Sequence, residues 1–346
     1  MCIRDRAYIV PSLAQRGPVL VVFHLVQEML AHGHECTVYY FDNIIELKFP
    51  CKTERIFFLK SINFSSYDIV HSHGLRPDAY IFLHKPWRLK GTVCISTLHN
   101  MVIQDLAAQY NVLTAYLIGN MWMFLLCRHT KVVVLTKVAL NYYSRWISQK
   151  KLFIVHNTCI IDKCNKLYTA EVKRILSFKE NKILLGCNAL LTPRKGVDQI
   201  IRVLPFMPNV KLWIVGDGKS KISLLDLADR LGVRDRVCIA GYKKNAYQYL
   251  PYYDIYVMSS RSEGFPLSLL EAMIYKRNIV CSDIPIFKEI LSENEVTFFE
   301  REKIDSLMEA IKLALQTDKS EVACQCFWEH YSPDCFYRDY LAVYTN

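Results

Sequence analysis

The most informative chemical pattern in the sequence is a pair of glutamates, Glu263 and Glu271, in the run Glu-Gly-Phe-Pro-Leu-Ser-Leu-Leu-Glu. An apolar run before the first glutamate predicts a β-strand, and Pro266 suits the first position of a following helix. A helix begins with unpaired backbone N–H groups, here near Leu267 and Ser268, which can bind an anion. Carboxylates beside an anion site favour a ligand with both phosphate and hydroxyl groups, such as a nucleotide sugar. The alternative is a capped helix that carries two solvated glutamates.

A second pattern, Arg194-Lys195-Gly196, follows a predicted strand at Ile183–Asn188 and precedes a predicted helix. Two cations at the start of a helix suit a diphosphate, because arginine offers a planar fork of donors and lysine a compact charge. A solvated basic turn is the alternative.

The candidate residues in the first half of the chain are weaker signals. Gly17 follows the first predicted strand, where a glycine lets the backbone approach a phosphate, although an ordinary turn would also use it. His99 ends another predicted strand and could face a ligand, or it could be a structural histidine. His71 and His73 share one strand face and could bind a metal, but no third ligand is apparent, so we expect no metal site.

These residues need elements that position them, and the chain supplies strands and helices in alternation, which predicts parallel α/β architecture. In the first half the predicted strands are Ala7–Val10, Cys36–Phe41, Asp68–Ser72, Thr92–Leu98, Lys131–Leu135 and Leu152–Val155. In the second half they are Ile183–Asn188, Lys211–Val215, Val237–Ala240, Ile255–Ser259, Asn278–Ser282 and Val296–Phe299. The predicted helices include Val19–Ala31, Val197–Leu204, Ser220–Leu231 and Pro266–Tyr275.

The alternation lapses in the polar, lysine-rich residues 157–182, where we expect a domain junction. The predicted fold is therefore two Rossmann-like, doubly wound domains, 1–160 and 161–327, that face a central cleft. Ligands of such sheets bind outside the carboxyl ends of the strands, which is where the candidate residues lie. The first six residues fit a strand poorly.

The charge of the chain is uneven. The net charge is +10, and residues 1–150 carry 16 Lys and Arg against 9 Asp and Glu. A basic first half favours an anionic partner, such as a phospholipid surface, a lipid-phosphate acceptor or nucleic acid. No run rich in Arg and Lys supports nucleic acid, so we expect none among the partners.

Two features bear on location. The 13 scattered cysteines, with no secretory signal pattern at the start, favour a reducing cytoplasm. The stretch Leu106–Cys127 has no charged residue and is long enough to span a bilayer. It contains polar amides, which are costly in lipid, so we expect a buried or interfacial helix rather than a transmembrane one.

Taken together, four segments resemble the retaining glycosyltransferases of family four, which have the GT-B fold. They are Arg194-Lys-Gly196, Leu212-Trp-Ile-Val-Gly216-Asp-Gly218, Val237-Cys-Ile-Ala-Gly241-Tyr242 and Glu263-Gly-Phe-Pro-Leu-Ser-Leu-Leu-Glu271. The resemblance covers about residues 183–290 and is looser in the first half. It implies that the last residues, 328–346, form a helix that returns to the first domain.

The resemblance also implies roles. Arg194 and Lys195 would hold the donor diphosphate and stabilise the leaving nucleotide, and Glu271 would accept hydrogen bonds from the ribose. Glu263 would contact the transferred sugar, and His99 would lie near its reacting carbon. The remaining donor contacts implied are Gly17, Gly241, Tyr242, Gly264, Phe265, Pro266, Leu267 and Ser268.

The implied reaction moves a hexose from a UDP- or GDP-linked sugar to a glycan or lipid-linked acceptor, with retention, in surface polysaccharide or lipid-linked glycan assembly. The chain lacks Asp-x-Asp, the metal-binding signature of the other major glycosyltransferase fold, so we expect no metal and no other cofactor. We expect a cytoplasmic enzyme, peripheral at the inner face of the cell membrane. Two alternatives are a nucleotide-sugar epimerase and a non-catalytic subunit that binds nucleotide sugar.

Overall fold

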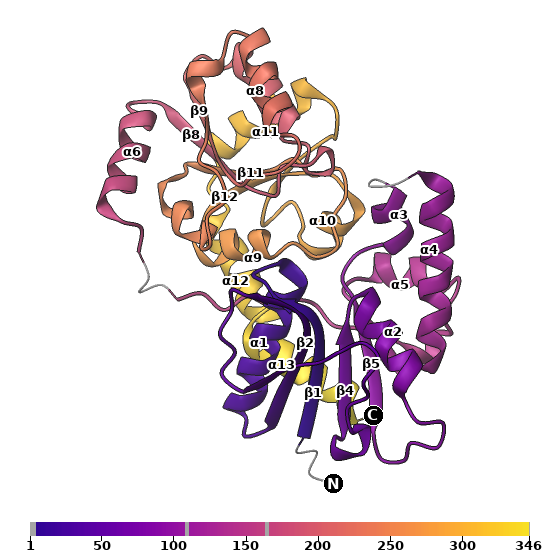
Figure 1. Ribbon diagram of the computed structural model, residues 1–346. Helices are drawn as coiled ribbons and strands as arrows, with labels where there is room; N and C mark the ends of the chain where they lie inside the picture. Colours follow the sequence, from indigo (N-terminus) through magenta and orange to yellow (C-terminus); the bar gives the residue numbers. More distant parts are fainter. Residues whose placement is uncertain (1–4, 108–110, 163–165, 346) are drawn as a thin grey trace. The chain divides into compact units, whose positions relative to one another are not determined.

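The computed structural model describes residues 5–107, 111–162 and 166–345 (Figure 1). The chain divides into two compact units. One unit comprises residues 1–160 together with 331–346, and the other comprises residues 161–330. Residues 328–330, which we expected in the returning helix, belong to the second unit.

The first unit is built on a seven-stranded parallel sheet with the order β3-β2-β1-β4-β5-β6-β7. Its strands are β1 Asp5–Leu13, β2 Glu35–Ile45, β3 Lys52–Arg55, β4 Ile69–His73, β5 Val93–Leu98, β6 Lys131–Val134 and β7 Leu152–Ile154. Its helices are α1 Gly17–Ala31, α2 Leu75–His84, α3 Val102–Ala107, α4 Val112–Leu125, α5 Lys137–Tyr143 and α13 Pro333–Thr345.

Helix α13 joins the first unit through aromatic side chains. It packs near α1, and its buried residues include Tyr340 and Tyr344 (Figure 1). The guanidinium of Arg6 lies 5.6 Å from the centre of the Tyr344 ring. The expectation that the first six residues fit a strand poorly was wrong for Asp5 and Arg6, since β1 begins at Asp5 and Arg6 is fully buried within it. The aromatic ring beside Arg6 belongs to a helix more than 300 residues away, so the sequence near Arg6 does not reveal it.

The second unit is built on a six-stranded parallel sheet with the order β10-β9-β8-β11-β12-β13. Its strands are β8 Ile183–Asn188, β9 Val210–Val215, β10 Val237–Ile239, β11 Ile255–Met258, β12 Asn278–Ser282 and β13 Thr297–Phe299. Its helices are α6 Thr169–Lys179, α7 Val197–Val203, α8 Lys221–Arg230, α9 Leu267–Ile274, α10 Pro285–Ile290, α11 Ile304–Gln316 and α12 Ser320–His330. The core lies between the sheet and helices such as α7, α8 and α11.

All the predicted strands are present, and the doubly wound α/β fold is confirmed. Several elements were not named by the sequence reading, and β3 and α6 show why. β3 is exposed at all its positions, and α6 has one buried residue, Ile175, so neither has the apolar periodicity that sequence reading depends on.

The uncharged stretch Leu106–Cys127 is not one helix. Helix α3 ends at Ala107, residues 108–110 lie outside the described part, and α4 begins at Val112. Within the described residues, none of the helices has both the length and the apolar character needed to cross a bilayer.

Both sheets reverse their strand order beside their first strand. The chain leaves β1 for β2 on one side and later returns to β4 on the other, and β8 lies in the same way between β9 and β11. The carboxyl ends of β8 and β11 therefore form a topological switch point, the usual ligand position in open α/β sheets. The loops after these two strands carry Arg194, Lys195 and Glu263.

Candidate active site

Two loops meet at the switch point of the second unit, and a glycine permits their approach. Gly196, which ends the short turn Pro193–Lys195, has a left-handed backbone with φ of 60°. A Cβ atom here would overlap the carbonyl oxygen of Ser259, at the end of β11. The same junction is held by a hydrogen bond from the Arg261 N–H to the Arg194 carbonyl at 2.7 Å. Gly196 thus brings the basic turn against the loop that carries Glu263.

The meeting of the loops creates a buried ionic cluster. Nζ of Lys195 lies 2.5 Å from Oε1 of Glu263, and Nη1 of Arg194 lies 3.5 Å from Oε2. The Ser260 hydroxyl donates to the same Oε1 at 2.6 Å, and Arg194 also donates to the Ser262 carbonyl at 2.9 Å. Glu263 is 5% exposed. Two cations around one carboxylate leave an excess of one positive charge, which suits an anionic ligand.

Opposing effects set the charge state of Glu263. Burial disfavours the carboxylate, but the Lys195 ammonium and the Arg194 guanidinium, with hydrogen bonds from Lys195 and Ser260, hold the pKa of Glu263 below its ordinary value. The residue is therefore ionised at neutral pH.

Glu271 has a different environment. It lies on α9 with a half-buried side chain, and burial raises its pKa to about 7. None of the residues that the structure describes donates a hydrogen bond to its carboxylate. The two glutamates of the motif therefore differ in chemistry, because one is a paired carboxylate and the other is poised to exchange a proton near neutral pH.

A network missed by the sequence reading fixes the loop after β11. Arg261 forms ion pairs with Asp198 at 2.9 Å and Glu302 at 2.6 Å, while Gln199 donates to the Ser259 carbonyl at 2.8 Å. The partners come from α7 and from the turn after β13. Such pairs join residues far apart in sequence and leave no local pattern, whereas Ser260, three residues before Glu263, could have been noticed in the motif.

The segment from Gly264 to Ser268 leads into α9. The helix begins at Leu267, so Pro266 is its N-cap rather than its first helical residue, with extended backbone angles (φ −78°, ψ 119°). Phe265 and Pro266 are buried, and Leu267 and Ser268 are half-buried at the helix start. The N–H groups expected to bind an anion are thus at the first turn of a helix that begins directly beyond the ionic cluster.

Gly241 and Tyr242 follow the edge strand β10. Gly241 accepts a hydrogen bond from the Gly216 N–H at 2.9 Å, and this joins the loops after β9 and β10. Gly216 is itself required, because a Cβ there would overlap the Ala189 carbonyl oxygen. Tyr242 is 61% exposed. Its expected position beside a nucleotide base stays a prediction.

The candidate residues of the first unit also follow strands. Gly17 is the exposed first residue of α1, and His99 follows β5. Nδ1 of His73 lies 2.9 Å from Nε2 of His99, and the ring of His71 packs against that of His73. Burial lowers the pKa of His99 to about 4, so the imidazole is neutral at pH 7.

This histidine cluster reaches α13. Nδ1 of His71 lies 2.9 Å from the Tyr344 hydroxyl, and its Nε2 lies 2.8 Å from the Thr97 hydroxyl. His71 and His73, which the sequence offered as possible metal ligands, thus form hydrogen bonds with other side chains of the first unit. In the described part of the chain, no group of three potential ligand side chains could hold a metal ion.

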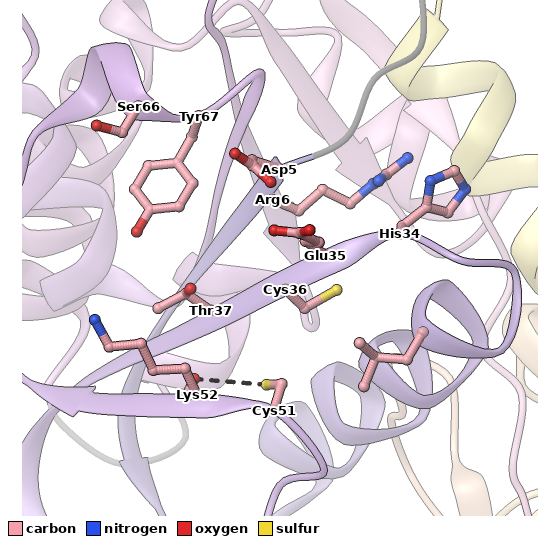
Figure 2. Close-up of a pocket in the computed structure, with 11 residues that line it drawn as sticks. Asp5, Arg6, His34, Glu35, Cys36, Thr37, Cys51, Lys52, Ser66 and Tyr67 are labelled. Atoms are coloured by element: carbon pink, nitrogen blue, oxygen red, sulfur yellow. Dashed lines mark hydrogen bonds between the residues drawn. The ribbon is translucent and has the colours of Figure 1, made fainter.

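A pocket of about 470 Å³ lies elsewhere in the first unit, and Figure 2 shows the side chains that line it. It is lined by residues at the start of β1 and β2, including Arg6, Glu35 and Cys36, with Lys52 of β3. These are the amino ends of parallel strands, the opposite edge from the one that carries Gly17 and His99. We therefore do not assign the donor to this pocket.

Comparison with known proteins decides the family. Residues 169–325 match the model of glycosyl transferases group 1. The O-antigen biosynthesis glycosyltransferase WclY of Escherichia coli is 31% identical over 298 residues, which cover 84% of each chain. The chain belongs to the group 1 glycosyltransferases. The matched region contains the whole ionic cluster and Glu271.

Solved structures confirm the GT-B fold of this glycosyltransferase. HepE of Anabaena, determined in complex with UDP and glucose, superposes with a TM-score of 0.80 at 14% identity over 98% of both chains. Sucrose-phosphate synthase of Thermosynechococcus elongatus gives a TM-score of 0.79 at 15% identity, over 99% of this chain and 98% of that one.

Proposed function

We propose that this glycosyltransferase transfers a hexose from a UDP- or GDP-linked sugar, with retention and without a metal, and that the second unit holds the donor. The observation that carries the proposal is the cluster of Arg194, Lys195 and Glu263 at the switch point, directly before the start of α9. The two cations and the backbone N–H groups at the start of α9 could bind a diphosphate. The carboxylates of Glu263 and Glu271 could accept hydrogen bonds from hydroxyl groups of the donor.

The chemistry follows from charge. Breaking the bond between the anomeric carbon and the diphosphate leaves negative charge on the leaving nucleotide and positive charge on the sugar. Lys195 and Arg194 are held in place by Glu263, so they can stabilise the leaving phosphate without reorganising. Glu263 is ionised and would stabilise the cationic sugar. Glu271 would accept hydrogen bonds from the ribose, and Gly17 and His99 are proposed to contact the donor from the first unit.

The proposed acceptor is a glycan or a lipid-linked glycan in surface polysaccharide assembly. Several relatives support this class by name, including WclY and the amylovoran biosynthesis glycosyltransferase AmsD of Erwinia amylovora, which is 30% identical over 158 residues. The cytoplasmic location inferred from the cysteines is part of the same proposal.

The test begins with a thermal-shift panel of UDP- and GDP-linked hexoses, because a ligand of the native state raises its melting temperature. The stabilising donor is then incubated with lipid-linked glycan acceptors. NMR coupling constants of the product report its anomeric configuration. Transfer with the donor's configuration supports the proposal. Release of an epimer from donor alone would indicate an epimerase, and binding without turnover would indicate a non-catalytic subunit.

We predict that transfer survives removal of divalent metal. Lys195 and Arg194 supply the positive charge that a metal would otherwise place on the diphosphate. The initial rate in excess EDTA should therefore equal the rate without chelator. Complete loss of activity that Mg²⁺ or Mn²⁺ restores would overturn this mechanism.

We also predict that nucleotide binding releases a proton from Glu271. With a pKa of about 7, the residue is protonated in much of the free protein below that pH. Burial of this group makes the unliganded fold less stable as pH rises from about 4.5 to about 7, because ionisation is disfavoured. Hydrogen bonds from ribose favour the carboxylate and lower its pKa, so nucleotide affinity should rise with pH over the same window.

The measurement is calorimetry at about pH 6.5 in two buffers of different ionisation enthalpy, where Glu271 should release roughly 0.7 of a proton. The nucleotide phosphate titrates in the same range, so the quantity of interest is the difference between the parent and Glu271→Gln. Glu309→Gln, at an exposed glutamate of α11, is the control and should behave as the parent. Equal proton release by all three proteins would exclude Glu271 from the nucleotide site.

A further inference from the structure

Helix α4 exposes an apolar face. The side chains of Leu113, Leu117 and Phe124 are 72%, 65% and 62% exposed. With Val112, Tyr116 and Met121, which are also exposed, they recur at helical spacing along one side. The opposite side contains Ala115, Gly119 and Met123, which are buried, and α3 packs against it at Ile103. Large apolar patches of this kind on a protein surface mark an interaction site.

Tryptophans and cations border this α4 face. The Trp146 indole donates to the Asn120 side chain of α4 at 3.1 Å, and Arg145 beside it is exposed. One turn further along α4, Phe124 packs against Phe82 of α2 at 5.4 Å between ring centres. The loop after α2 then presents Trp87, whose side chain is 90% exposed.

The Trp87 ring is itself associated with positive charge. The Arg128 guanidinium lies 4.4 Å from its centre and donates to carbonyl groups of α2 and its end. Arg88 and Lys90, in the same loop, are exposed. Amphipathic aromatic rings and long cationic side chains are the residues that favour the boundary between lipid headgroups and acyl chains.

The sequence around α4 has an unusual charge balance. Residues 75–161, which run from the start of α2 to beyond β7, contain ten Lys and Arg and two acidic residues, Asp105 and the buried Asp78. The elements that pack on α4, namely α2, α3 and the turn after α4, all belong to this range. The cationic border of the apolar face consists of the exposed Arg88, Lys90 and Arg145, with Arg128 beside Trp87.

We propose that the α4 face and its cationic border dock on an anionic phospholipid bilayer, with the apolar side chains at the boundary between headgroups and acyl chains and the cations at the phosphates. A second copy of the chain fits the surface less well, because a symmetric interface would bring two cationic borders together. This proposal does not depend on the chemistry assigned to the second unit.

The test is co-sedimentation of the full chain with vesicles of phosphatidylcholine alone, and with vesicles in which about one third of the lipid is phosphatidylglycerol. The parent should bind the anionic vesicles more tightly, and salt should reduce that preference. The double variant Leu117→Gln with Phe124→Gln should bind them about 10- to 100-fold more weakly. Arg88→Gln with Lys90→Gln should lower the preference for anionic lipid about tenfold or more.

The matched control is Ile222→Gln with Phe206→Gln, two residues of the second unit that are 74% and 67% exposed. It should bind vesicles as the parent does, and all variants should keep the parent's melting temperature and nucleotide affinity. Equal vesicle binding by the α4 variant and the control would overturn the proposal. So would an α4 variant that changes a dimer into a monomer in light scattering while its lipid binding stays normal. If the parent bound vesicles but bound no nucleotide, that result would count against the proposed function and not against membrane docking.

Discussion

Replacing Lys195 by alanine is expected to weaken the binding of nucleoside diphosphate about 10- to 150-fold. The figure corresponds to about 1.5–3 kcal/mol, the usual contribution of a hydrogen bond to a charged group. Lys195 is 2.5 Å from Glu263 in the free protein, so its ammonium group is already in position for the ligand. Binding is measured by calorimetry with UDP and GDP. Lys312→Ala, which removes an exposed lysine from its pair with Glu309, is the control and should leave affinity unchanged.

The substitution also leaves Glu263 short of a partner inside the protein. Breaking a buried pair at one end typically costs about 3–5 kcal/mol of stability. A loss of binding could then reflect unfolding, so the double variant Lys195→Met with Glu263→Gln is the second test. It removes both charges and should regain much of the melting temperature without regaining nucleotide affinity. Affinity that returned with stability would show that Lys195 is structural, and unchanged affinity in Lys195→Ala would exclude it from the phosphate site.

The sequence was sufficient for the fold because parallel strands are continuous apolar runs. Strands such as Ile183–Asn188 and Asn278–Ser282 have the bounds expected from the sequence. It was also sufficient to place Arg194, Lys195 and Glu263 at carboxyl ends of strands, because each follows a predicted strand and all strands of a parallel sheet end at the same edge.

What the sequence could not predict depends on contacts between distant residues. The link from Arg261 to Asp198 and Glu302 spans three separate loops or helices, and the contact of His73 with His99 joins two neighbouring strands. The sequence also could not predict that the pKa values of Glu263 and Glu271 shift in opposite directions. The difference arises from the two cations beside Glu263, which lower its pKa, and from burial, which raises the pKa of Glu271.

That difference leads to the second large effect, because the two glutamates should fail in different ways. Glu271 is proposed to hold the ribose, which does not react, so its hydrogen bonds exist before and during bond cleavage. Glu271→Gln should therefore raise KM and weaken nucleotide binding about 10- to 100-fold, while kcat changes little. Glu263 is proposed to stabilise the sugar as it gains positive charge. Glu263→Gln should then lower kcat on the order of 100-fold, because the interaction is stronger in the transition state.

The structure also predicts the direction in which nucleotide affinity changes in Glu263→Gln. Glu263 offsets the charge of Lys195 and Arg194 in the free protein, so Glu263→Gln leaves both cations fully available to the diphosphate. Nucleotide affinity should be unchanged or higher in that variant, while it falls in Glu271→Gln. Steady-state kinetics and nucleotide calorimetry on both variants, with Glu309→Gln as control, separate the roles. Weaker nucleotide binding in Glu263→Gln with a normal kcat would mean that this carboxylate serves only to position Lys195.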